Sequence, residues 1–173
     1  MHLLLAEKGS LAETAEAVDL GQSPGEIVVL SAADTELAAL SSAARRLNLA
    51  PGRLRLANLM RLTHPMSVDT YVERTLSHAR LVVVRLLGGI GYWPYGVDAV
   101  RAAAQRNGFA LALLPGDDRP DPALDAAGYE PRRADSGQEG LRGIALWNPD
   151  AVVLDLGLPD MDGKDVLARA REF

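Results

Sequence analysis

The sequence predicts an α/β fold with a mostly parallel sheet, and two observations support that prediction. Short, apolar, β-rich runs alternate along the chain with longer segments of helical periodicity. The segments between them carry the Pro, Gly, Ser and Asn residues that begin and end helices. Strands that alternate with helices pair in parallel and are buried on both faces, which explains continuous apolar runs such as Leu81–Val84.

The first two thirds of the chain contain four predicted strands. They are Ile27–Leu30, Leu54–Ala57, Leu81–Val84 and Phe109–Leu114. Three helices are expected between them: one from Asp34 to the stop at Pro51-Gly52, one capped by Ser67, and one from Pro94 to the stop at Asn107-Gly108. Each of these helices has an apolar face that would cover the sheet.

The last third of the chain repeats the alternation. Tyr129–Arg133 and Ala151–Leu154 are predicted strands, and a final helix is expected around Val166. Between the strands, Ser136–Glu139 is a capping box, in which the serine hydroxyl and the glutamate carboxylate each satisfy a free backbone N–H group. We therefore predict a single domain over residues 1–173: a flavodoxin-like (Rossmann-like) three-layer sandwich whose mostly parallel sheet has five or six strands.

Composition excludes several classes of function. The formal net charge of −5 argues against a nucleic-acid-binding surface and against a polybasic membrane patch. No apolar run approaches the ~20 residues of a membrane span, and the start of the chain lacks the pattern of a secretory signal. Without cysteine there is no disulfide, thiolate nucleophile or thiolate metal site. We expect a cytoplasmic protein that binds neither nucleic acid nor membrane.

Six stretches of the first two thirds of the chain carry a family resemblance. They are His2–Ser10, Asp19–Pro24, Arg55–Leu59, His64–Asp69, Arg85–Gly89 and Leu113–Pro122. In this order they resemble the N-terminal part of the large subunit of aerobic cobaltochelatase, which inserts cobalt into the corrin precursor of vitamin B12. The resemblance covers residues 1 to about 124, a small part of that large subunit, and no chelatase residues can be carried over to this chain.

A second resemblance lies in the motif Leu154–Gly163, in which a predicted strand ends at Asp155 and a loop of the form D-x-x-x-P-x-x-D-G follows. Gly128–Glu130 and Ala134–Gly137 agree with the preceding strand and helix start of the same family. From about Asp125 to residue 173 the chain resembles part of a response-regulator receiver domain, from its second strand to its third helix. The resemblance implies that Asp155 is a vestigial phosphoacceptor.

Receiver chemistry also needs Mg²⁺, held by carboxylates that neutralise the transferred phosphoryl group. Receivers take these carboxylates from an acidic pair after their first strand. Asp117 and Asp118 follow the predicted strand Phe109–Leu114 in a similar way, so we expect a Mg²⁺ site formed by Asp117, Asp118 and Asp155. The interval from Asp118 to Asp155 is shorter than in a receiver by roughly two helical turns, so we expect the helix between them to be short.

A receiver site has two further parts, a hydroxyl and a lysine that bind the phosphoryl group. Ser31 follows the strand Ile27–Leu30 and would supply a phosphoryl-binding hydroxyl if that strand paired beside Ala151–Leu154; otherwise it simply begins the next turn. The phosphoryl-binding lysine of receivers has no counterpart, because Lys8 and Lys164 are the only lysines and neither follows a strand.

We interpret the chain as an engineered chimera, with a natural fusion as the alternative. The leading functional hypothesis is a flavodoxin-like scaffold with no catalytic activity, no cofactor (Mg²⁺ excepted) and no obligatory partner. One alternative is a cryptic receiver that binds Mg²⁺ and accepts a phosphoryl group on Asp155. Another is a module with residual affinity for a tetrapyrrole or for chelatase partners. An unpaired sheet edge beside Ala151–Leu154 would favour a homodimer.

Overall fold

The computed structural model describes residues 16–116, 122–127, 132–149, 152, 154, 155 and 157–172. The chain forms two compact units, Met1–Tyr129 and Glu130–Phe173. Their boundary falls close to residue 125, where the two resemblances meet. That the two units make one hybrid domain stays a prediction.

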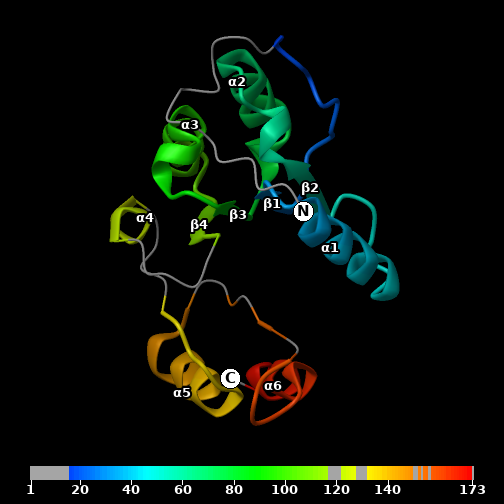
Figure 1. The fold of residues 1–173 in the computed structure, drawn as a ribbon. Coiled ribbons are helices and arrows are strands. Elements are labelled where there is room, and N and C mark those ends of the chain that lie inside the picture. The colour runs from blue at the N-terminus through cyan, green and yellow to red at the C-terminus, as the bar shows by residue number, and fades with distance from the viewer. Residues whose placement is uncertain are drawn as a thin grey trace, which may run out of the picture. The chain divides into compact units, whose positions relative to one another are not determined.

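The first unit contains a four-stranded sheet in which every pairing is parallel (Figure 1). The strands are β1 (Ile27–Ser31), β2 (Leu54–Asn58), β3 (Leu81–Leu86) and β4 (Ala110–Pro115). Their order is β2-β1-β3-β4, which is the flavodoxin-like order as far as the fourth strand. The predicted fold class is therefore confirmed.

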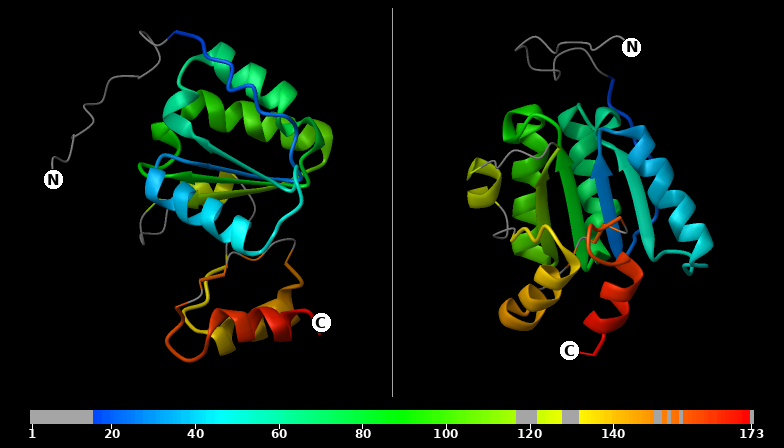
Figure 2. Two further views of the ribbon diagram at one scale, coloured as in Figure 1. Left: turned by 90° about the vertical axis from the view of Figure 1, so that its right-hand side faces the viewer. Right: turned by 60° about the horizontal axis from the view of Figure 1, so that its bottom comes forward.

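Helices cover both faces of this sheet, with α2 and α3 on one face and α1 on the other (Figure 2). Their bounds are α1 (Asp34–Arg46), α2 (Pro65–Arg74), α3 (Pro94–Asn107) and the short α4 (Pro122–Ala127), with 3-10 turns η1 (Leu59–Arg61), η2 (Leu76–His78) and η3 (Ile90–Tyr92). None of the helices in the described part of the chain is long and apolar enough to cross a membrane.

The core lies between the sheet and the pair α2 and α3. Alternate strand residues are buried there because successive side chains of a strand point to opposite faces. The buried apolar strand residues of this core are Val28, Leu30, Ala57, Val82, Val84, Leu86, Leu111 and Leu113. Helix residues such as Val68, Val97 and Val100 are buried in the same cluster. Each side chain of this size contributes about 1.5–3 kcal/mol when it is fully buried.

The start of α2 differs from the prediction. The N-cap is His64, whose Nδ1 accepts a hydrogen bond from the N–H of Met66 at 3.1 Å, and Pro65 opens the first turn. Proline is suited to that position because its missing N–H would have no helical partner. Ser67 is not the cap: it is buried, and its hydroxyl accepts a bond from the N–H of Val18 at 2.7 Å.

The second unit contains two helices, α5 (Gly137–Trp147) and α6 (Gly163–Ala170). The N-cap of α5 is Ser136, whose hydroxyl accepts a hydrogen bond from the N–H of Glu139 at 3.2 Å. The Glu139 carboxylate accepts the N–H of Asp135 at 3.0 Å. The serine half of the predicted capping box is confirmed, and the glutamate half is displaced by one residue.

The prediction of five or six strands is wrong for the described residues, which form four. Of the predicted strand Tyr129–Arg133, Arg132 and Arg133 are described and are not in a strand. In Ala151–Leu154 the described residues, Val152 and Leu154, are not in a strand either, and Val152 is 52% exposed. The rest of these two segments lies outside the described residues. An apolar run forms a strand only where a neighbouring strand supplies hydrogen-bond partners.

Candidate functional site

The first candidate site is the carboxyl edge of the sheet. In open, doubly wound sheets, ligands bind outside the carboxyl ends of the strands where the strand order reverses. Here that point lies between β1 and β3, since β1 connects to β2 on one side and pairs with β3 on the other. Ser31 and Arg85 are directly opposite each other in the β1–β3 register, at this edge.

Ser31, Glu36 and Arg85 form a closed polar network here. The Ser31 hydroxyl donates to one oxygen of the Glu36 carboxylate at 2.6 Å, and Arg85 donates to the other at 2.5 Å. Arg85 also donates to the carbonyl oxygen of Gly116 at 3.0 Å, and the N–H of Ala33 donates to the Ser31 hydroxyl at 3.1 Å. Glu36 lies in the first turn of α1, where the helix dipole favours a negative charge. The network joins the ends of β1, β3 and β4.

Sequence reasoning found Ser31 but missed its partners. Ser31 is 1% exposed, and its hydroxyl is engaged by Glu36 and Ala33. The signal for Arg85 was a charged residue inside the otherwise apolar strand Leu81–Leu86. The predicted pairing of the Ile27–Leu30 strand beside Ala151–Leu154 is wrong, because β2 and β3 occupy the two edges of that strand. That Ser31 supplies a phosphoryl-binding hydroxyl stays a prediction. Asp117 and Asp118 of the expected Mg²⁺ site lie outside the described residues.

Asp155, the expected phosphoacceptor, is exposed. Its Oδ1 accepts a hydrogen bond from the N–H of Gly157 at 2.9 Å, which is the short loop that an aspartate makes with its own backbone two residues on. A single antiparallel bridge between Gly157 and Asp162 closes the loop that follows. Within the described residues no group of three or more His, Asp or Glu side chains is placed to hold a metal ion.

The other acidic residues of this loop bind helix N-termini. The Asp160 carboxylate accepts the N–H groups of Gly137 at 2.7 Å and Gln138 at 3.0 Å, at the start of α5. The hydrogen bonds from Gln138 and Gly137 lower the pKa of Asp160. Asp162 is the N-cap of α6, because its Oδ1 accepts the N–H of Lys164 at 2.8 Å. The receiver-like motif thus connects the two helices of the second unit.

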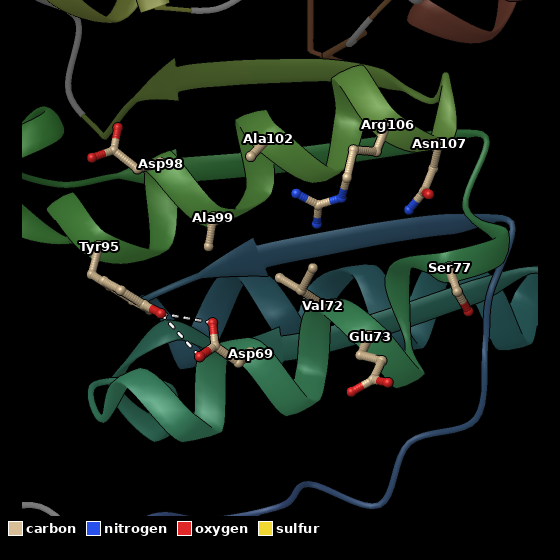
Figure 3. A pocket seen from close by; sticks show the side chains of 10 residues that line it. All are labelled: Asp69, Val72, Glu73, Ser77, Tyr95, Asp98, Ala99, Ala102, Arg106 and Asn107. Carbon is tan, nitrogen blue, oxygen red and sulfur yellow. Dashed lines mark hydrogen bonds between the residues drawn. The ribbon is translucent and has the colours of Figure 1, made fainter.

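A second candidate site is a groove between α2 and α3, which we call the α2–α3 groove (Figure 3). Its volume is about 660 Å³. The lining residues are Asp69, Val72, Glu73, Ser77, Tyr95, Asp98, Ala99, Ala102, Arg106 and Asn107. Sequence reasoning missed this groove; the available signal was the i, i+4 spacing of Asp69 and Glu73 on one helix.

The strand order defines the first unit as a flavodoxin-like module. The chain is 57% identical over 125 residues to the aerobic cobaltochelatase subunit CobN of a Sinorhizobium species and 48% identical over 131 residues to CobN of Pseudomonas aeruginosa. These matches cover 72% and 76% of this chain. A different region is 50% identical, over 48 residues, to the transcriptional regulatory protein KdpE of Mycobacterium tuberculosis and covers 28% of this chain. Both predicted resemblances are therefore confirmed.

The chain spans only a small part of these relatives: 10% of each cobaltochelatase subunit and 21% of KdpE. No family model matches the chain, and no solved structure matches it significantly. The chain thus combines two segments whose relatives are different proteins.

Proposed function

We propose that the chain is a chimeric, flavodoxin-like scaffold without catalytic activity of its own. The observation that carries this proposal is the network of Ser31, Glu36 and Arg85 at the carboxyl edge of the sheet. The place where folds of this class bind their ligands is taken by side chains of the protein itself.

The network supports this proposal because a ligand at this edge would have to replace hydrogen bonds that the protein already makes. An anionic ligand that binds Arg85 has to displace the Glu36 carboxylate, which also accepts the Ser31 hydroxyl. Ser31 is buried, so its hydroxyl would lose the charge-assisted hydrogen bond to Glu36 unless the ligand replaced it. Exchanging one carboxylate for another anion therefore gains little binding free energy.

A cryptic receiver is the second candidate, and the exposure of Asp155 favours it, because a phosphodonor can reach that carboxylate. Carboxylate oxygens are the ligands that Mg²⁺ prefers, so the predicted set of Asp117, Asp118 and Asp155 has suitable chemistry. The ion would neutralise charge during phosphoryl transfer. Asp160 and Asp162 are not proposed as ligands, since their oxygens accept backbone N–H groups of α5 and α6.

A third candidate, residual binding of a tetrapyrrole or of chelatase partners, is supported by the similarity to CobN. Only binding is proposed here, and not the chelatase activity of the relatives, because the match covers a tenth of their length. Titration of the chain with a corrinoid, followed by visible absorbance, tests it. A saturable shift of the spectrum would support this candidate over the scaffold.

Intact mass after incubation with acetyl phosphate and Mg²⁺ separates the scaffold from the receiver. We expect no phosphoryl adduct on the wild-type chain, with an unchanged circular dichroism spectrum that shows the protein is folded. An adduct that the Asp155→Asn variant lacks would overturn the scaffold proposal and establish the receiver. An adduct that both proteins carry would place the modification elsewhere and would argue against the receiver.

A further inference from the structure

The α2–α3 groove combines an apolar floor with charged walls. Val72 of α2 and the small residues Ala99 and Ala102 of α3 form the apolar part of its lining. Alanine side chains leave space between the helices that larger residues would fill. Along α3, the lining runs from Tyr95 to Asn107, which is about 18 Å at the rise of an α-helix. A groove of this length holds about five residues of an extended chain.

Carboxylates dominate the charge of the walls, with Asp69 and Glu73 on α2 and Asp98 on α3. In the described part of the chain, neither Glu73 nor Asp98 makes a side-chain hydrogen bond or an ion pair. The one guanidinium in the lining, Arg106, is likewise unpaired there and extends from α3 across the groove (Figure 3). The walls therefore present an excess of negative charge that the protein does not neutralise itself.

Asp69 is oriented by Tyr95, which approaches it from the facing helix. The Tyr95 hydroxyl lies 2.8 and 2.9 Å from the two carboxylate oxygens of Asp69 (Figure 3). This hydrogen bond raises the pKa of Tyr95 above its usual value, so the hydroxyl stays protonated and continues to bridge the two helices. The bridge fixes one end of the groove.

We propose that the α2–α3 groove is a docking site for a short segment of a partner protein that carries lysine or arginine beside small apolar side chains. The apolar side chains would pack on Val72, Ala99 and Ala102, and the basic groups would lie between Glu73 and Asp98. Complementary charge of this kind steers association and sets the register of the bound segment. A second copy of this chain is a poor occupant, because the protein is itself acidic, with a net charge of −5.

The test is fluorescence anisotropy with the full chain and a labelled probe peptide in which lysine alternates with alanine and leucine. We expect saturable binding that weakens as salt is added, because these charges are exposed and screened. A peptide of the same length with glutamate in place of lysine should not bind. Equal binding of the two peptides would overturn the proposal.

Two double variants of equal charge locate the site. Glu73→Gln with Asp98→Asn removes the unpaired carboxylates of the groove, and we expect the dissociation constant to rise roughly fivefold. Glu16→Gln with Glu172→Gln removes two exposed carboxylates that do not line the groove and should leave the dissociation constant unchanged. If the two double variants weaken binding equally, the effect is one of net charge and the groove is not the site.

A third variant tests the floor without a change of charge. Ala102→Leu fills the groove from α3, and leucine is a good helix former, so the helix is retained. We expect weaker peptide binding with an unchanged thermal midpoint. Unaltered binding would show that the peptide does not enter the groove.

Discussion

The unit Met1–Tyr129 buries an apolar cluster that spans its strands and helices, whereas Val166 is the one buried apolar side chain in the described part of Glu130–Phe173. In the second unit the other buried positions of α5 and α6 are glycines. Carboxylates accept hydrogen bonds at the start of both helices, and a serine does so at the start of α5. The first unit is thus stabilised mainly by apolar burial, and the second depends on helix capping and close backbone packing. The comparison shows that similar α/β sequence patterns can lead to units held together by different interactions.

The largest expected effect is in the core of the first unit. Leu30→Ala removes a fully buried side chain, and we expect a loss of about 2–5 kcal/mol in the free energy of unfolding. Urea unfolding followed by the indole N–H signals in an NMR spectrum measures this effect for each unit. Trp93 reports on the first unit, where its indole donates to the carbonyl of Leu62 at 2.7 Å, and Trp147 reports on the second.

In this experiment the Trp93 signal should change at lower urea concentration in the variant, while the Trp147 signal keeps its wild-type midpoint. A shift of both signals together would contradict the comparison, because it would mean that the two units unfold as one.

A matched pair of glycine substitutions tests the close packing of α5. A Cβ atom at Gly137 would lie 2.4 Å from Met161 and 2.8 Å from Val166, so Gly137→Ala should destabilise the second unit by about 1–3 kcal/mol. At Gly140 the nearest atom is 3.8 Å away, so Gly140→Ala should stabilise the helix by about 0.5–1 kcal/mol. Hydrogen exchange of the α5 amides measures both effects. If both substitutions stabilise α5, the helix does not depend on the close contact of Gly137 with Met161 and Val166.

We expect low pH to destabilise the second unit by protonating the Asp160 carboxylate. The hydrogen bonds from Gln138 and Gly137 make its pKa lower in the folded protein than in the unfolded chain. Such a group stabilises the fold above its unfolded pKa, and this contribution is lost as the pH falls below the ordinary value of 3.8. The protection of α5 amides should therefore decrease in this range. Asp160→Asn, which has no charge to lose, should be less protected at neutral pH and should lack this pH dependence.

The smallest effect is expected at the carboxyl edge of the first unit. The Arg85 side chain is 38% exposed and that of Glu36 is 26% exposed, so solvent screens their ion pair. Arg85→Gln should lower the free energy of unfolding by less than about 1 kcal/mol, as measured by urea unfolding followed by the Trp93 signal. A loss as large as that of Leu30→Ala would show that this network, and not apolar burial, dominates the unit.

The strands of the first unit could be predicted because each combines an apolar run with a following helix, and the sheet supplies a partner for each. The segment Ala151–Leu154 has the same local pattern, yet its described residues are not in a strand and Val152 is exposed. Strand formation depends on a neighbouring strand, which the local pattern does not encode. Ser31 was recognised from its position after a strand. Its bond to Glu36 was not, because it depends on how α1 is placed against the sheet.

The strand order has a consequence for synthesis on the ribosome. β1 emerges first but is an inner strand, with β2 on one side and β3 on the other. One edge of β1 therefore stays unpaired in the nascent chain until Leu81–Leu86 has left the exit tunnel. One edge of β3 then stays unpaired until β4 has been synthesised. Open strand edges of this kind can pair with other chains, so we expect such pairing to be most favourable between the synthesis of β1 and that of β4.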